Sequence, residues 1–356
     1  MSQHRQPSRA RRTLFRAGPL LGALIVIGGL LAAGGAWALT RNDGSAHRET
    51  ADPTVSASSS AVSTPVATPL ATPTPRNCTA SPHLCGYPDA TNTGVPTGTT
   101  LQQVPGQVSR GKGWYYDPRG WIEVDGKGAV LQDVSTSHTI DITGSDVTIK
   151  DVRVTLSGNN FGIDLRHTHN VIIEDSDISS PYSGPNRLMV GIKDVFGDST
   201  GTKILQNNIW HTATGVQVAA GLIDDNYIHD FGYRSGDHVN GVTVNGGTTP
   251  LTIEHNTIFV NLSQTDAISL FEDFGVEANK VIEDNLVAGG SYSIYGGQNA
   301  GGPTAYNIRI IGNRFSRKYY PLGGQFGPLA AFNSHARGNV WSGNIWDDSE
   351  TVIRGF

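Results

Sequence analysis

The sequence reads IEHNTI at residues 253–258 and IEDNLV at residues 282–287, and related six-residue segments recur along most of the chain. Eight such segments carry an apolar residue at their first and sixth positions. They start at residues 149, 173, 204, 223, 253, 282, 310 and 341, with spacings of 19 to 31 residues. Short strands that recur at such spacings are typical of a solenoid.

A second strand precedes most of these segments, as in NGVTV at residues 240–244 and DAISL at residues 266–270. Its apolar residues alternate, which indicates a half-buried strand. We expect these to point inward: Ile163, Ile192, Val216, Val242, Ile268 and Ile294. No amphipathic helix pattern separates the strands, which excludes a helical solenoid and a leucine-rich repeat. The pattern predicts an all-β chain folded as a right-handed parallel β-helix solenoid.

The fourth position of the repeated segment indicates an Asn ladder. It is Asn in the last six segments: Asn207, Asn226, Asn256, Asn285, Asn313 and Asn344. Successive turns of a parallel solenoid stack at about 4.8 Å, so identical amides can hydrogen-bond from one turn to the next. Since Asn tolerates left-handed backbone geometry, we expect the ladder residue itself to occupy the tight corner.

Composition excludes several classes of protein. The chain has 356 residues, a formal net charge of −5, 44 Gly, two Cys and 16% charged residues. So much Gly and so little charge exclude a coiled coil or a long helical bundle. The folded part is not basic, so we expect no nucleic-acid partner. Two Cys are too few for a disulfide-rich miniprotein or a multi-Cys zinc array.

The chain divides into five parts. Residues 1–39 combine a basic start with an apolar run, which predicts a signal peptide or an uncleaved signal-anchor helix in the membrane. The pair Arg11–Arg12 resembles a twin-arginine export signal. Residues 40–76 form a Ser/Thr/Pro-rich disordered stalk, and residues 77–138 a disulfide-containing initial segment and N-terminal cap. Residues 139–349 form the β-helix and residues 350–356 a C-terminal tail.

This organisation predicts an extracellular or cell-surface protein. Outside the cytoplasm, Cys78 and Cys85, with six residues between them, should form one disulfide. The residues after position 38 carry a net charge of −10, which favours neutral ligands unless a basic patch receives an anionic polymer. The candidate patch consists of Arg309, Arg314, Arg317 and Lys318.

Two long stretches carry a resemblance to a known group. CGYPDATNTGVPTGTTL at residues 85–101 and NRFSRKYYPLGGQFGPLAAFNSHARGNVWSGNIWDD at residues 313–348 resemble exported actinobacterial β-helix proteins. GDHVNGVTV at residues 236–244 resembles the middle of the same group. The group shares the pectate-lyase-like fold and has no assigned activity. The resemblance therefore implies fold and export, while fold alone does not choose a reaction.

One outward column of side chains is a candidate binding groove. It consists of Asp164, Lys193, Gln217, Thr243, Ser269 and Tyr295. Beside it runs a column of small residues that we expect to form a flat outer floor: Gly162, Gly191, Gly215, Gly241, Ala267 and Ser293. Such a polar face suits hydroxyl-rich sugars, and a merely solvated sheet face is the alternative.

The loop before NGVTV contains the densest polar cluster. We expect His238, Asp237 and Asp266 to share a cleft with Tyr295 as catalytic groups. A His beside carboxylates can act as a general base, and two carboxylates can hydrolyse a glycoside. Lyase chemistry would instead use His238 as base, Arg234 against a uronate and a Tyr as acid. The alternative for His238 is a loop-ordering hydrogen bond. The other predicted substrate-binding residues are Arg234, Asn240, Glu272 and Asp273.

The sequence therefore predicts an exported protein that binds a polysaccharide or cell-wall glycan and, as a lyase or hydrolase, cleaves it. The alternative is a non-catalytic, adhesin-like surface module, and the sequence leaves open whether the protein is an enzyme. We expect a monomer without a cofactor. No spacing indicates zinc, while calcium stays open, with these candidate ligands: Asp224, Asp225, Asp237 and Asp266.

Overall fold

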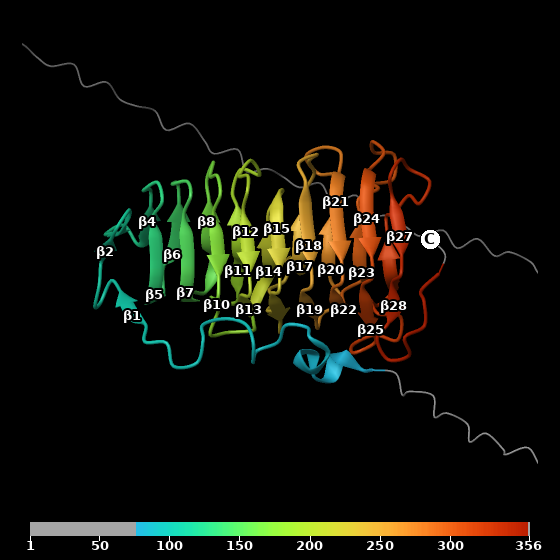
Figure 1. The fold of residues 1–356 in the computed structure, drawn as a ribbon, viewed down its shortest axis with the longest axis horizontal. Helices are drawn as coiled ribbons and strands as arrows, with labels where there is room; N and C mark the ends of the chain where they lie inside the picture. The colour runs from blue at the N-terminus through green and yellow to red at the C-terminus, as the bar shows by residue number, and fades with distance from the viewer. Residues whose placement is uncertain (1–75, 355–356) are drawn as a thin grey trace, which may run out of the picture. The chain divides into compact units, whose positions relative to one another are not determined.

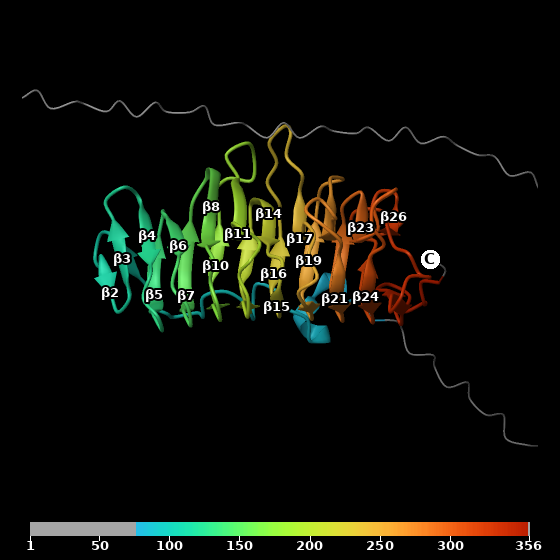
Figure 2. The ribbon, with the colours of Figure 1, turned by 90° about the horizontal axis from the view of Figure 1, so that it is seen from above.

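In the computed structural model, which describes residues 76–354, the chain forms an all-β parallel solenoid of about nine turns (Figures 1 and 2). The 17-stranded sheet contains β1 (Gln102–Val104), β5 (Val130–Thr136), β7 (Thr148–Thr155), β9 (Ile172–Glu174), β10 (Asp177–Ser179), β12 (Lys203–Leu205), β13 (Asn208–Trp210), β15 (Gly221–Asp224), β16 (Tyr227–His229), β18 (Leu251–Glu254), β19 (Thr257–Val260), β21 (Ala278–Glu283), β22 (Leu286–Gly289), β24 (Tyr306–Ile311), β25 (Arg314–Ser316), β27 (Val340–Ser342) and β28 (Ile345–Trp346). The 11-stranded sheet contains β2 (Arg110–Gly111), β3 (Trp114–Asp117), β4 (Trp121–Val124), β6 (Thr139–Ile142), β8 (Gly158–Leu165), β11 (Leu188–Asp194), β14 (Thr212–Gln217), β17 (Asn240–Val244), β20 (Asp266–Leu270), β23 (Tyr292–Gly296) and β26 (Gly327–Ala330).

A typical turn has one strand of the smaller sheet and two short strands of the larger one, as in β17, β18 and β19. Each strand pairs in parallel with its equivalent one turn later, for example β17 with β20. The six expected inward residues of the smaller sheet, Ile163 to Ile294, are 0% exposed and belong to the apolar core. The predicted parallel solenoid and its inward residues are therefore confirmed.

The Asn ladder is present. The side-chain Nδ2 of each ladder residue from Asn207 to Asn313 donates to Oδ1 of the next one at 2.9–3.0 Å. The backbone N–H of the same residue donates to the same oxygen at 2.9–3.0 Å. All six Asn side chains are 0% exposed.

The prediction that the ladder Asn itself adopts the left-handed conformation is wrong. The left-handed conformation belongs to the preceding residue, such as Asp225 with φ 58°, His255 with φ 51° and Asp284 with φ 49°. Because that preceding residue changes the direction of the chain, the Asn side chain points into the interior. There it forms hydrogen bonds with backbone N–H and C=O groups that the turn would otherwise leave without partners.

The expected outer floor of small residues is also wrong. A Cβ atom at Gly215 would lie 2.5 Å from Cγ2 of Ile228 and 2.6 Å from the carbonyl oxygen of Gly241. Since Ile228 is 0% exposed, this glycine faces the core, as does the following Val216. The strand breaks its alternation here, and glycine lets the backbone approach the opposite sheet closely.

Residues 76–101, called here the N-terminal segment, run along the outside of the solenoid (Figure 1). The segment begins with two 3-10 helices, η1 (Cys78–Ala80) and η2 (Pro82–Cys85), and the predicted disulfide joins Cys78 to Cys85. Thr79 Oγ1 donates to Asp347 in the last turn at 2.6 Å. Further along, the N–H of Gly94 donates to the carbonyl of Gln206 at 2.8 Å, and the chain then enters β1.

Both ends of the solenoid are covered. At one end, β2, β3 and β4 form antiparallel pairs before the first parallel pairing. At the other end, Phe315 contacts the rings of Trp341 and Trp346, and the N–H of Ile353 donates to the carbonyl of Asn344 at 2.8 Å. The predicted signal or anchor and nearly all of the predicted stalk lie outside the described residues. Within residues 76–354, no helix is long and apolar enough to cross a membrane.

Candidate functional site

Polar side chains of the 11-stranded sheet form one column, called here the polar column, in which Thr243 and Ser269 are buried at 2% and 0% exposure. The parallel registers of β8, β11, β14, β17, β20 and β23 align the six expected members, Asp164, Lys193, Gln217, Thr243, Ser269 and Tyr295. Glu123 and Asp141, on the preceding turns, extend the column. These two acids were not predicted because they lie at or before the first clear repeat, although TIDI at residues 139–142 shows the same alternation.

The polar column supplies part of the floor of a pocket of about 370 Å³. Lys193, Gln217 and Thr243 line it from the column, and the turns after β11 and β20 add Phe196 and Phe274. Both rings are exposed, Phe196 to 56% and Phe274 to 86%. Exposed aromatic rings beside a concave polar floor are typical of a ligand site. Sequence reasoning missed both residues because neither belongs to the repeat.

Lys193 brings an ammonium group to the pocket. Its Nζ donates to Oε1 of Gln217 at 2.5 Å. Burial lowers the pKa of Lys193, and neighbouring carboxylates oppose that shift. One of them, Asp194, accepts the backbone N–H of Gly197 at 3.1 Å and so holds the turn that carries Phe196. The floor therefore offers both hydrogen-bond donors and acceptors.

Asp164 lies one turn from Lys193 and is 4% exposed. Burial raises the pKa of Asp164 to about 6, although the guanidinium of Arg166 acts in the opposite direction. Arg166 donates to Asp164 at 3.1 Å and to Asp141 at 2.6 Å, and burial raises the pKa of Asp141 too. Oδ1 of Asp164 is buried without a hydrogen-bond partner among residues 76–354. Asp164 can therefore change its protonation close to neutral pH.

Asp237 orders the loop before β17. Its carboxylate accepts two hydrogen bonds from the guanidinium of Arg187, at 2.5 and 2.7 Å, and Arg187 is 1% exposed. It also accepts the backbone N–H of Arg234 at 2.7 Å. His238 is exposed, and its Nδ1 lies 3.5 Å from Oγ1 of Thr265. The structure thus places Asp237 in a buried ion pair and leaves His238 and Arg234 at the surface.

Asp266 is enclosed. It is 0% exposed and lies in register with Asn240, which is 6% exposed. Burial raises the pKa of Asp266 well above its ordinary value, and the hydroxyl of Ser269 acts against this shift. Burial, with the carboxyl of Asp266, also raises the pKa of Tyr295 to about 12. Because Asp266 has no exposed surface, it does not share an open cleft with His238. The catalytic roles of these residues stay predictions.

Two further predicted residues lie in the turn after β20. Glu272 accepts the backbone N–H of Asn299 through Oε2 at 3.2 Å, while Asp273 is exposed. Both come shortly before Phe274 in the chain, but neither lines the pocket.

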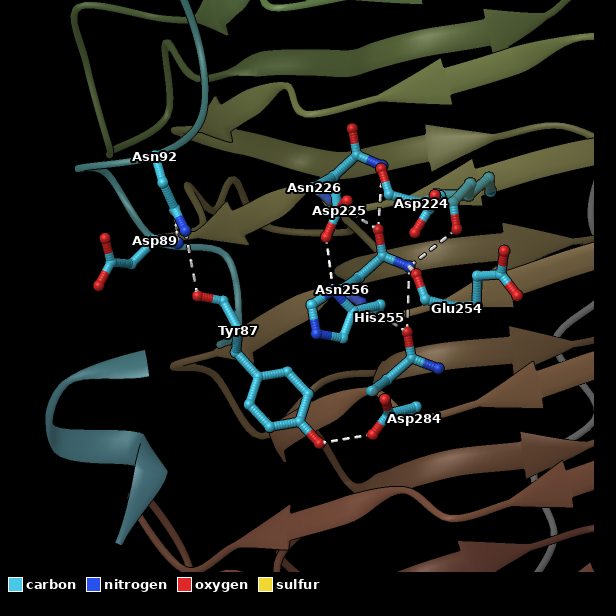
Figure 3. A network of polar contacts seen from close by, with 12 residues as sticks. Tyr87, Asp89, Asn92, Asp224, Asp225, Asn226, Glu254, His255, Asn256 and Asp284 are labelled. Atoms are coloured by element: carbon cyan, nitrogen blue, oxygen red, sulfur yellow. Dashed lines mark hydrogen bonds and ion pairs between the residues drawn. The ribbon is translucent and has the colours of Figure 1, made fainter. Parts of the chain in front are cut away.

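A separate cluster at the corners that join β15 to β16 and β18 to β19 could hold a metal ion (Figure 3). One ligand atom each of Asp224, Asp225 and His255 lies within 4.8 Å of the others. Nδ1 of His255 is 2.5 Å from Oδ1 of Asp225, and this hydrogen bond raises the pKa of His255. Tyr87 stacks on His255 with ring centroids 5.1 Å apart, and its hydroxyl donates to Asp284 at 2.8 Å. Imidazole with carboxylates suits a transition-metal ion better than calcium.

The four calcium candidates do not form one site. Asp224 and Asp225 lie together, but Asp237 pairs with Arg187 and Asp266 is enclosed. The basic patch expected near the C-terminal end is half neutralised, because carboxylates pair with two of its four members. Arg314 pairs with Asp347 and Glu350, and Arg317 pairs with Asp348.

Comparisons with known proteins add no family assignment. No family model matches this chain, and no curated protein matches it either. The function proposed below therefore depends on the geometry of the site itself.

Proposed function

We propose that this protein binds a polysaccharide chain along the polar column. The observation that carries the proposal is the pocket over Lys193, Gln217 and Thr243, bordered by the exposed rings of Phe196 and Phe274. Sugar rings present hydroxyl groups at their edges and C–H groups on their faces. A polar floor with aromatic borders matches both kinds of surface.

The dimensions of the polar column suit a polymer rather than a single sugar. From Lys193 to Tyr295 the column crosses four steps between turns, about 19 Å at about 4.8 Å per step. Beyond the pocket, Tyr295 contacts Phe271 and Tyr292 with ring centroids 5.5 Å apart. A glycan chain lying across the strands would therefore meet polar groups first and an aromatic cluster afterwards.

Cleavage of the bound chain is a second candidate function, and one observation favours it. Burial raises the pKa of Asp164 to about 6, one of its oxygens is buried and unpartnered within residues 76–354, and it lies one turn from Lys193, outside the lining of the pocket. A carboxyl group whose pKa is about 6 is half protonated at about pH 6 and can act there as a general acid, and Asp141 supplies a second carboxylate one turn away. We propose that this activity lies at the cell surface or outside the cell, as the resemblance to exported β-helix proteins implies.

Retention on immobilised polysaccharides tests the binding proposal. The panel includes neutral and acidic plant, microbial and cell-wall glycans. We expect wild type to bind one class, and F196A and F274A each to raise the Kd about fivefold, since one aromatic contact contributes about 1 kcal/mol. Y182A is the matched control, because Tyr182 is 54% exposed and does not line the pocket. Equal Kd values for wild type and both pocket variants would overturn the proposal, as would no retention on any glycan.

Product analysis separates binding from cleavage. Wild type, D164N, H238A and D266N are each incubated with the retained glycan, and reducing ends and unsaturated products are measured. Cleavage through Asp164 predicts products with wild type and at least a hundredfold fewer with D164N, which is the usual scale for a general acid. Products that disappear only in H238A or D266N would instead assign the reaction to the loop before β17. Retention without products from wild type would leave a binding module.

A further inference from the structure

A buried ion pair supports one wall of the pocket from behind. Glu277, just before β21, and Lys280, within it, are both 0% exposed, and their Oε2 and Nζ atoms are 3.7 Å apart. The Nζ of Lys280 donates to three backbone carbonyls, those of Ala219, Gly247 and Thr249, at 3.3, 3.1 and 2.7 Å. Burial lowers the pKa of Lys280, while these three acceptors match the three donors of an ammonium group and Glu277 acts against the shift, so the contacts favour its charged form.

The same pair contacts the residues that line the pocket. Oε1 of Glu277 accepts the backbone N–H of Gly246 at 2.6 Å. Gly246 and Gly247 both line the pocket, and the backbone N–H of Phe274 donates to the carbonyl of Asn245 at 2.9 Å. Residues 245–249, called here the wall segment, therefore connect the buried pair to the exposed ring of Phe274.

We propose that Glu277 is a proton-dependent positioning residue: with its proton bound it favours the closed wall segment, and its ionisation favours an open one that holds ligand less tightly. The proposal rests on the proposed function for the identity of the ligand. It does not make Glu277 a catalytic residue, because this side chain reaches the pocket only through Gly246.

The direction of the pH effect on the wall segment follows from the burial of Glu277. Burial is the largest influence and raises its pKa to about 7, the charge of Lys280 opposes that shift, and Glu272 adds to it. Lys280 and Glu272 are thus the charged side chains that act most strongly on Glu277 within the described residues. If the wall segment opens, water reaches the carboxylate and its pKa falls toward the ordinary value of about 4.3. The closed wall therefore binds the proton more tightly. Its advantage over the open wall is lost progressively as the pH rises from about 4.3 to about 7, and it does not change further above pH 7, where both forms are ionised.

The measurement is the Kd of wild type and E277Q for the retained glycan, from about pH 5.5 to 8.5 around this transition. Gln keeps an oxygen for the N–H of Gly246 but never ionises. We expect the Kd of wild type to rise with pH up to about pH 7, by at most about tenfold per pH unit, the limit for one proton, and to level off above it. E277Q should lack this rise and keep at pH 8.5 the affinity that it has at low pH. A merely structural role predicts the opposite, weaker binding by E277Q at every pH.

Matched controls separate Glu277 from other groups that titrate in this range. E283Q removes a partly exposed carboxylate from the same strand and should keep the wild-type profile. Asp164 also titrates near the floor, with a pKa of about 6, so the decisive quantity is the difference between wild type and E277Q. If E277Q keeps the wild-type pH profile, or binds more weakly at all pH values, the proposal is overturned.

A readout without ligand makes failure of this proposal distinguishable from failure of the proposed function. The amide signal of Gly246 in an NMR pH titration reports on the carboxylate that it contacts. We expect a step near pH 7 in wild type and none in E277Q. If no glycan is retained but the step is present in wild type and absent in E277Q, the proposed function fails and the proton coupling of the wall segment stands. If the Gly246 signal shows no step near neutral pH, the role of Glu277 is refuted whatever the glycan result.

Discussion

Asn256, in the middle of the ladder, is the most informative place to perturb the fold. Its Nδ2 donates to the carbonyls of Ile223 and Glu254 at 2.9 and 2.7 Å and to Oδ1 of Asn285 at 3.0 Å. Its Oδ1 accepts the backbone N–H and the side-chain N–H of Asn226, both at 2.9 Å. N256A removes all of these hydrogen bonds at a position that is 0% exposed.

The expected cost follows from the groups left behind. The backbone N–H of Asn226 loses its acceptor, and the carbonyl of Ile223 loses a donor. One buried polar group without its partner costs about 1–3 kcal/mol, so N256A should lower the free energy of unfolding by about 2–6 kcal/mol. N256D keeps the shape but replaces two donors by an oxygen facing carbonyl groups, so its cost should grow as the pH rises and the new carboxyl ionises.

Urea unfolding followed by circular dichroism measures these differences, with N186A as control because Asn186 is exposed. A loss for N256A within about 0.5 kcal/mol of that for N186A, the usual range of surface substitutions, would refute the reasoning. So would an N256D variant whose stability does not depend on pH.

Three further predictions concern other parts of the molecule. G215A places a Cβ atom 2.5 Å from Ile228 and should cost about 1–3 kcal/mol of unfolding free energy through overpacking, measured by urea unfolding; no loss would contradict the inward orientation. The hydrogen bond to Asp225 raises the pKa of His255, so its stabilising contribution is complete below about pH 6.5 and is lost as the pH rises through the folded pKa; D225N should flatten this part of the stability profile. D347A should release the start of the N-terminal segment, measured as faster proteolysis near residue 80 than in wild type, while unchanged cleavage would refute this anchoring role.

The repeated part of the fold could be predicted because each turn repeats the same physical problem. Every turn must bury an equivalent of Ile228 and an equivalent of Asn226, so the sequence shows the same pattern many times. The error over Gly215 has the same origin, since simple alternation assumes a straight strand. The two inward residues, Gly215 and Val216, lie between polar neighbours, Thr214 and Gln217. A pattern of alternating polar and apolar residues therefore does not reveal that the strand breaks its alternation at Gly215.

The candidate site was only partly predictable because its parts follow different rules. The polar column belongs to the repeat, so Gln217 and Thr243 could be aligned from the sequence alone. Phe196 and Phe274 lie in turns of different length, and only the stacking of those turns brings both to one pocket. The pairing of Asp237 with Arg187 joins residues 50 positions apart, and no local pattern indicates it.

The N-terminal segment gives this solenoid an order of assembly. In a simple repeat array each turn contacts only its neighbours, so chains of many lengths can fold. Here Cys78 and Thr79 bind Asp347 of the last turn, and the segment then runs back to β1 at the opposite end. During synthesis these residues emerge before the surface that receives them, so they dock only after the last turn has been made. A truncated chain would keep its stacked turns without this closure, which makes completeness of the chain a condition of its full stability.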